Sequence, residues 1–241
     1  MKIIALIPAK STSQRIKNKN IADLQGHPLM AYSIASALEA DIFCRVVVST
    51  DSREYASIAR QYGASVPWLR PLRYATPTSP DIDWVYELMQ LLWEEEHPMA
   101  FAILRPTSPF RQADTIREAW EEFQKSSADS LRAVQLVREH PGKMWKIYNN
   151  RMFPLIPIAM DQGPAPWHSQ QSQFLPKVWV QNASLEMART EMMFRTRSIA
   201  GANVMPFYTG AYEGFDINEP WDLVKARWLA RTGRARLPRI G

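Results

Sequence analysis

The sequence has little cysteine and no long apolar run, and each shortage excludes a class of protein. Cys44 is the single cysteine among 241 residues, so the chain cannot form an internal disulfide. It lies in an apolar run, Phe43 to Val48, where we expect a buried, reduced thiol. The first apolar stretch is cut by Pro8, too early for a signal peptide. No window reaches the roughly 18 to 20 apolar residues of a membrane span, so we expect a cytoplasmic protein without membrane contact.

The sequence also lacks clustered metal ligands and a basic surface spread along its length. Its four histidines are scattered without zinc spacing, and we expect His140, which precedes a proline, to be a surface loop residue. The net charge of +5 is matched by five arginines, with no acid, in the last fifteen residues. These are Arg227, Arg231, Arg234, Arg236 and Arg239. A polynucleotide-binding surface needs basic residues across the body as well, so we expect no nucleic-acid partner.

Apolar strands alternate with helical patterns along most of the chain. The expected strands are 2–8, 45–49, 100–104, 130–137 and 178–180, and the expected helices are 28–40, 50–63, 81–96, 114–125 and 219–231. The strands are apolar on both faces, which favours a mostly parallel, twisted sheet covered by helices on both sides. We therefore predict an α/β, Rossmann-like fold in a single domain, 1–241.

The segment from about 138 to 176 breaks this pattern. It contains six prolines and little periodicity, and it is too long for an ordinary connection. We expect an excursion that serves substrate contact or dimerisation.

Three polar loops follow predicted strands, where ligands bind in folds of this class. They are 9–20, the segment from Asp51 onwards, and 105–109. The first holds four cations and three hydroxyl groups but no glycine, so it is neither a P-loop nor a dinucleotide fingerprint. A basic, hydroxyl-rich loop can bind a triphosphate, or it can be a solvated basic loop. The residues alone leave both interpretations open.

Seven short segments, in this order, extend the pattern over nearly the whole chain. They are Ile7 to Asn20, Val46 to Asp51, Arg70-Pro71 with Ala75, Leu104 to Pro109, Glu139 to Pro141 with Lys143, Asn182-Ala183, and Gly214 to Asn218. The set resembles the motifs of the CMP-sugar synthetases, or acylneuraminate cytidylyltransferases. The first corresponds to I-P-A-R-x-x-S-K-x-x-x-x-K-N and the fourth to L-Q-P-T-S-P. Each match is short, but all seven are in register.

The resemblance implies a nucleotide-diphospho-sugar transferase fold and a homodimer that uses CTP and Mg²⁺ to activate an acidic sugar, with release of pyrophosphate. It implies that Lys10, Lys19 and Asp216 are catalytic and that Asp216 holds the metal. The nucleotide would be bound by Lys10, Ser11, Ser13, Arg15, Lys19, Asn20, Arg70 and Ser79. The sugar would be bound by Arg105, Thr107, Ser108, Lys143 and Asn182.

The departures from the family pattern gather on the sugar side. Arg105 replaces a glutamine, Glu186 a tyrosine, and Val180 an arginine that meets the sugar carboxylate in sialic acid enzymes. Near the triphosphate, Gln14 replaces a basic residue, for which Arg15 could substitute, and Asn218 replaces the second aspartate of D-x-D. We expect a nucleotidyltransferase with an altered acceptor pocket, in which Arg105 could supply the missing anion contact.

Simpler roles remain open for several of these residues. Asp51 could cap the helix that follows it, and Asn218 could owe its identity to capping the last helix. The segment 107–109 could be only a turn. For the whole chain, a different nucleoside triphosphate, a sugar phosphate as acceptor, or a non-catalytic nucleotide-sugar-binding homologue are the alternatives.

Overall fold

The computed structural model describes residues 2–156, 166–210 and 212–241. The chain divides into two compact units, Met1–Ala133 with Asn182–Gly241, and Val134–Gln181. The predicted excursion at about 138–176 lies inside the second unit, and its expected roles in substrate contact or dimerisation stay predictions.

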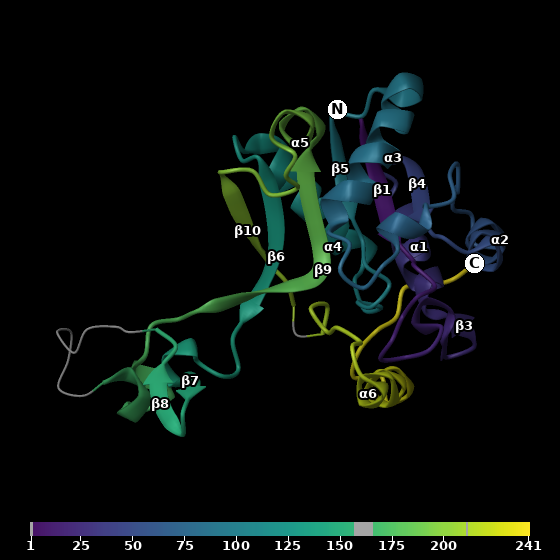
Figure 1. Ribbon diagram of the computed structural model, residues 1–241. Coiled ribbons are helices and arrows are strands. Elements are labelled where there is room, and N and C mark those ends of the chain that lie inside the picture. The colour runs from purple at the N-terminus through teal and green to yellow at the C-terminus, as the bar shows by residue number, and fades with distance from the viewer. Residues whose placement is uncertain (1, 157–165, 211) are drawn as a thin grey trace. The chain divides into compact units, whose positions relative to one another are not determined.

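A six-stranded sheet with the order β10-β6-β9-β5-β1-β4 forms the centre of the fold (Figure 1). Its strands are β1 (Ile3–Pro8), β4 (Phe43–Ser49), β5 (Ala100–Ile103), β6 (Ser130–Leu136), β9 (Trp179–Arg189) and β10 (Val204–Tyr208). β1 pairs in parallel with β4 on one side and β5 on the other, whereas β9 runs antiparallel to β5. The predicted Rossmann-like, mostly parallel α/β fold is confirmed.

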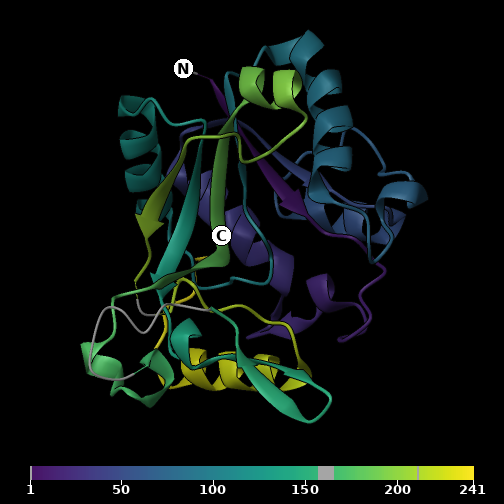
Figure 2. The same ribbon diagram turned by 60° about the vertical axis from the view of Figure 1, so that its left-hand side comes forward.

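Alternate residues of β1 enter two different cores, as expected of a strand buried on both faces. Ile3, Ala5 and Ile7 pack with helices α1 (Leu29–Ala40), α2 (Arg53–Gln61) and α4 (Ala113–Lys125). Ile4 and Leu6 pack with α3 (Asp81–Glu96) and α5 (Thr190–Thr196). Figure 2 shows α3 and α4 with the sheet between them. A third apolar cluster holds α6 (Pro220–Arg231) against Leu24, Leu29 and Phe110.

The helix ends decide two capping roles that the sequence left open. Ser52, not Asp51, caps α2, because its hydroxyl accepts a hydrogen bond from the N–H of Tyr55. The helix stops before Gly63, whose φ of 90° is favourable for glycine alone. Glu219 and Asp222 form a capping box at the start of α6, so Asn218 is not its cap. Asp51 and Asn218 are thereby available for other contacts.

Cys44 is free but exposed, which corrects the expectation of a buried thiol. It lies on β4, the edge strand, whose first three residues are only partly covered. Its thiol donates to the carbonyl of Ile3 and to Glu96. Partial desolvation of the sulfur by its neighbours and the carboxylate of Glu96 raise the pKa of Cys44 to about 11, so the thiol stays protonated at neutral pH.

The second unit contains a β-hairpin of β7 (Trp145–Tyr148) and β8 (Arg151–Pro154), paired antiparallel. Asn149 and Asn150 form its turn with positive φ at both positions, which asparagine tolerates well. His140 is buried, which corrects the expected surface position. Its ring accepts from the N–H of Gly142 and lies 3.0 Å from the carbonyl of Pro176. This histidine therefore connects the start of the second unit to its C-terminal part.

The remaining elements are short. A two-strand ribbon is formed by β2 (Asp23–Leu24) and β3 (His27–Pro28), and the 3₁₀ turns are η1 (Lys19–Ile21), η2 (Leu72–Tyr74), η3 (Pro141–Lys143), η5 (Trp167–Ser169) and η6 (Ser172–Phe174). Among the helices of the described residues, none has the length and apolar character that crossing a membrane requires.

Candidate functional site

The three polar loops predicted to carry function meet at one edge of the sheet. β4, β1 and β5 are adjacent and parallel, so the loops after Ser49, Pro8 and Ile103 leave the sheet on the same side. The loops after Pro8 and Ile103 line a cleft of about 340 Å³, together with residues from the segments 70–81 and 216–218 and with Ala183. Its lining includes Lys10, Ser13, Lys19, Asn20, Arg70, Tyr74, Ser79, Asp81, Arg105, Thr107, Ala183, Asp216 and Asn218. The cleft thus brings together most of the predicted site residues.

The first loop is tied down by side chains rather than by glycine turns. The N–H and hydroxyl of Ser11 donate to the two carboxylate oxygens of Asp51, at 2.7 and 2.6 Å. Thr12 donates to the carbonyl of Ala75 at 2.5 Å, and the amide of Asn20 donates to the carbonyl of Lys10 at 2.9 Å. Ser11 is predicted to face the nucleotide, but both of its hydrogen-bond donors bind Asp51 and it is absent from the cleft lining.

Two lysines of this loop reach the cleft. The ammonium of Lys10 donates to the carbonyl of Thr76 at 2.9 Å, and that of Lys19 donates to the carbonyl of Ile217 at 3.0 Å. Burial lowers the pKa of Lys19 below its usual 10.5, and the charge of Asp216 partly opposes this effect. Lys19 therefore joins the N-terminal loop to the segment that precedes α6.

Arg15 lies in a second hollow, of about 280 Å³, beside the cleft. This hollow shares Lys10, Ser13 and Lys19 with the cleft. The guanidinium of Arg15 donates to Asn218 at 3.0 Å and to Glu219 at 3.1 Å. Cations consequently line both the cleft and the hollow beside it.

Arg70 is buried at the end of β4. Its guanidinium donates to the hydroxyl and the carbonyl of Ser49, both at 3.0 Å, and its central carbon lies 4.3 Å from the ring centroid of Trp84. Burial lowers the pKa of Arg70 to about 10, although the charge of Asp81 opposes this shift. Arg70 thus remains a fixed positive charge in the cleft wall at neutral pH.

The segment 216–218 closes the cleft from the C-terminal side. The N–H of Ile217 donates to the carbonyl of Thr107 at 2.9 Å, which ties this segment to the 105–109 loop. The amide of Asn218 donates to one carboxylate oxygen of Asp216 at 2.5 Å. The other oxygen, Oδ1, is buried and has no hydrogen-bond partner among the described residues. Asp216 therefore offers one uncommitted, negatively charged oxygen.

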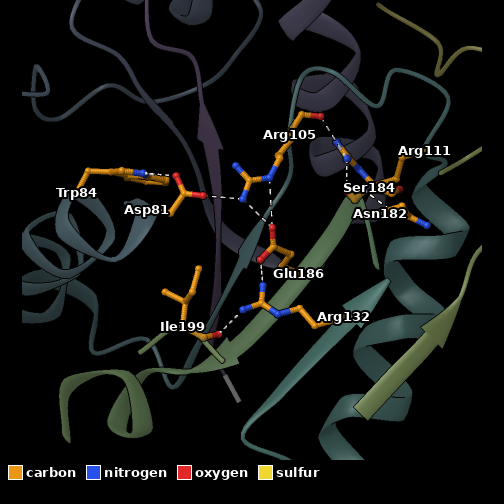
Figure 3. Close-up of polar contacts among 9 residues, drawn as sticks. All are labelled: Asp81, Trp84, Arg105, Arg111, Arg132, Asn182, Ser184, Glu186 and Ile199. Carbon is orange, nitrogen blue, oxygen red and sulfur yellow. Dashed lines mark hydrogen bonds and ion pairs between the residues drawn. The ribbon is translucent and has the colours of Figure 1, made fainter. Parts of the chain in front are cut away.

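A chain of charged side chains extends from the cleft, where Asp81 and Arg105 line the wall, to Glu186 and Arg132 behind them (Figure 3). Arg105 donates to Asp81 at 2.6 Å and to Glu186 at 2.7 Å. Glu186 is only 5% exposed and also forms an ion pair with Arg132. The guanidinium of Arg105 helps to hold the pKa of Asp81 below its usual value despite burial, which acts in the opposite direction. Arg132 in turn donates to the carbonyl of Ile199 at 2.9 Å.

Sequence reasoning missed several residues that build this wall. Asp81 and Arg132 belong to no motif, although a charged residue between two apolar residues of a strand, as Arg132 is in β6, signals a buried partner. Arg111 is fully buried and donates to the carbonyl of Ser184 and the hydroxyl of Ser33. Burial lowers the pKa of Arg111 to about 9.

Three predicted sugar-binding residues lie outside the cleft lining. Ser108 is buried in a turn whose N–H donates to the carbonyl of Arg105 at 3.2 Å, although its neighbour Thr107 lines the cleft. Asn182 is buried, with its amide donating to Thr209 and its oxygen accepting from the N–H of Ser184. Lys143 is exposed in the second unit. Ser79 lines the cleft, but its hydroxyl donates to the carbonyl of Arg73.

Comparison with known proteins shows to which family the chain belongs. The model of the cytidylyltransferase family matches residues 4–149. The CMP-N,N'-diacetyllegionaminic acid synthase of Legionella pneumophila is 31% identical over 233 residues, which cover 92% of this chain and 93% of that enzyme. The chain belongs to the cytidylyltransferase family. An N-acylneuraminate cytidylyltransferase of Streptococcus agalactiae is 26% identical over 227 residues, 93% of this chain but 52% of the longer streptococcal protein.

Solved structures agree on the fold. A CMP:2-keto-3-deoxy-manno-octonic acid synthetase, in complex with CTP, superposes with a TM-score of 0.70 at 16% identity and covers 97% of this chain and all of its own. The predicted resemblance to CMP-sugar synthetases is confirmed, and the cytidylyltransferase is a nucleotidyltransferase of that type. A larger hollow, about 720 Å³, lies along α6 and is lined by Gln25, Trp221, Val224, Lys225, Arg227, Trp228 and Arg231. Its lining has cations but no carboxylate, unlike that of the cleft.

Proposed function

We propose that this cytidylyltransferase transfers CMP from CTP to an acidic sugar and releases pyrophosphate. The observation that carries the proposal is the convergence of Lys10, Lys19 and Asp216 in one cleft at the edge of the sheet. It is supported by the alignment, over 92% of the chain, with an enzyme named for synthesis of a CMP-linked acidic sugar. Other relatives carry the names N-acylneuraminate and pseudaminic acid cytidylyltransferase.

The chemistry requires the sugar hydroxyl to attack the α-phosphate in line while pyrophosphate leaves. Such transfers depend mainly on positioning and on neutralising the charge of the phosphate oxygens. Lys10 and Lys19 supply ammonium groups, and the hollow that Arg15 shares with them extends the positive path for the departing pyrophosphate. We assign the nucleoside end to Asn20, Arg70 and Ser79, and further phosphate contacts to Ser13.

The residues present fit a magnesium ion held largely by the substrate. Mg²⁺ is commonly held by one or two carboxylates together with phosphate oxygens and waters. Asp216 provides one carboxylate with a buried, unpartnered oxygen, and its other oxygen is held by Asn218. The described residues contain no group of three or more acidic, histidine or cysteine side chains that could hold a metal without a substrate. The ion would neutralise triphosphate charge, with Asp216 as its protein ligand.

The homodimer and the cytoplasmic location are finer parts of the same proposal. The hairpin of the second unit exposes apolar side chains on both strands, among them Ile147, Tyr148 and Met152. Such side chains are typical of a surface that a partner covers. We assign the dimer contact to this hairpin, and we place the enzyme in the cytoplasm, where nucleoside triphosphates are available.

The test is pyrophosphate release by the pure protein with each of the four nucleoside triphosphates and a panel of acidic sugars, with Mg²⁺ or with a chelator. We expect turnover with CTP, at least one sugar and the metal. Lys19→Met should lower kcat by about 10²- to 10³-fold, as expected when one transition-state donor is lost. Lys125→Met, at an exposed site on α4, is the matched control and should leave activity unchanged. Preference for another triphosphate, or neither turnover nor CTP binding, would refute the proposal.

A further inference from the structure

The guanidinium group of Arg105 is fixed from two sides. Its Nη2 donates to both Asp81 and Glu186, and its Nε donates to Glu186 at 3.2 Å. The backbone carbonyl of the same residue accepts from the hydroxyl of Ser33 at 3.1 Å. An arginine held by its backbone and by two carboxylates loses little conformational freedom when it binds a ligand.

One nitrogen of this group is unused. Figure 3 draws Nη1 of Arg105 with no dashed line, and no described residue accepts a hydrogen bond from it. The side chain is 26% exposed and lines the cleft. Nη1 is therefore a charged donor available to a molecule in the cleft.

The charges around Arg105 favour an anionic ligand. Neither carboxylate that holds Arg105 is its partner alone, because Glu186 also pairs with Arg132 and Asp81 also lies near Arg70, which has Asp51 as a further neighbour. The positive charge of Arg105 is therefore only partly compensated in this wall. An anion placed in the cleft would balance it, while a neutral group would not.

The cations assigned to the triphosphate reach beyond the cleft. Lys10 and Lys19 line both the cleft and the hollow beside it, and Arg15 lines that hollow. Arg105 lines the cleft but not the hollow. This difference favours the acceptor over the triphosphate as the ligand of Arg105.

We propose that Arg105 is the specificity-determining residue that binds the carboxylate of the acceptor sugar, and that Asp81 and Glu186 are its positioning residues. This inference rests on the proposed function. Glu186 needs Arg132 as a second partner because Arg105 alone would leave a nearly fully buried carboxylate half paired. Two of the three departures on the sugar side, Arg105 and Glu186, are therefore one paired change.

The decisive experiment compares an acidic acceptor with its neutral methyl ester. The wild-type enzyme should prefer the acid. The double variant Arg105→Gln/Glu186→Gln removes one charge of each sign, so it leaves no new unpaired carboxylate at Glu186. We expect its KM for the acid to rise about 10- to 100-fold, the range of one charge-assisted hydrogen bond, with the ester unaffected. The KM for CTP should stay within about twofold of the wild-type value.

A second variant covers the case in which the double variant does not fold. Arg105→Lys keeps the positive charge but loses the planar fork, so it should weaken discrimination between acid and ester while CTP binding persists. Glu186→Gln alone should raise the KM for the acid with little change in kcat, as expected of a positioning residue.

The outcomes separate the two levels of the proposal. If the wild-type enzyme uses no sugar with CTP, the proposed function itself fails. If it does, and the folded double variant keeps the wild-type ratio of acid to ester, Arg105 does not bind the carboxylate. A rise in the KM for CTP instead of the sugar would place this guanidinium on the triphosphate and would equally overturn the inference.

Discussion

Lys19 is a positively charged side chain that is also partly buried. Its ammonium donates to the carbonyl of Ile217, close to the charge of Asp216, yet it is buried enough that its pKa falls below 10.5. A less hydrated ammonium interacts more strongly with a phosphate than a fully hydrated one does. The cost is that the residue loses its proton at a lower pH than an exposed lysine.

We expect CTP affinity to depend on the protonation of Lys19. Above its lowered pKa the free enzyme must take up a proton to bind the triphosphate, so the affinity should fall, by up to about tenfold per pH unit. The fall should begin below pH 10.5. Calorimetric titration of CTP between pH 7 and 10.5 measures it. Lys19→Arg is the control, because arginine stays protonated and should flatten the profile. An equally steep profile in that variant would assign the proton to another group.

The acceptor wall shows what a single sequence can and cannot reveal about a site. Arg105 and Glu186 were each recognisable as departures from a family pattern, since both fall inside short motifs. Their pairing was not, because they are 81 positions apart and only the antiparallel contact of β5 with β9 brings them together. Asp81 and Arg132 carried no motif at all and became visible only through their ion pairs.

At the scale of elements, the loop 9–20 has a fixed backbone although it contains no glycine. Its backbone is fixed by Asp51, which accepts two hydrogen bonds from Ser11 and lies at the end of the neighbouring strand. The loop between β1 and the η1 turn is therefore fastened to β4. This arrangement explains why Ser11 contributes to the site through its position rather than through its hydroxyl.

Asp51→Ala should loosen this loop and affect both stability and nucleotide binding. Loss of two hydrogen bonds to a carboxylate should lower the free energy of unfolding by about 1 to 3 kcal/mol and raise the KM for CTP. The neighbouring Ser52→Ala is a matched control, because it removes the cap of α2 at a cost of about 1 kcal/mol without touching the loop. Denaturant unfolding and initial rates compare the two variants. Equal KM values for CTP would show that Asp51 has no part in shaping the nucleotide site.

The elements that the sequence predicted share a simple cause. β1 and β5 are apolar on both faces, α2 has a serine cap and ends before a glycine, and α4 buries side chains at helical spacing, so local chemistry and tertiary position agree. The sequence predicts this strand only at 178–180, whereas β9 extends from Trp179 to Arg189. The rest of the strand was missed because buried polar residues such as Ser184 and Glu186 interrupt its apolar pattern. β10, α5 and the hairpin were missed because their exposed or mixed side chains resemble those of loops.

At the scale of the whole molecule, two exposed apolar surfaces compete for the role of dimer contact. One is the hairpin of the second unit, where Ile147 pairs across the strands with Met152 and both are exposed. The other lies along α6, where Trp221 and Trp228 are exposed. Stable dimers usually bury on the order of 1,200 Å² or more, so only a sizeable apolar surface can supply one.

We expect Ile147→Glu/Met152→Glu to convert a dimer into monomers. Directly paired residues of an antiparallel ribbon lie on the same face, so the double change puts two adjacent carboxylates into the proposed contact. Their desolvation should weaken association by at least about 100-fold, which sedimentation velocity over a range of concentrations measures. Trp221→Glu is the control on the competing surface and should leave the dimer intact. Because the cleft is formed entirely by the first unit, CTP binding should survive in both variants. Dissociation by Trp221→Glu alone would move the contact to α6, and a wild-type monomer at every concentration would remove it.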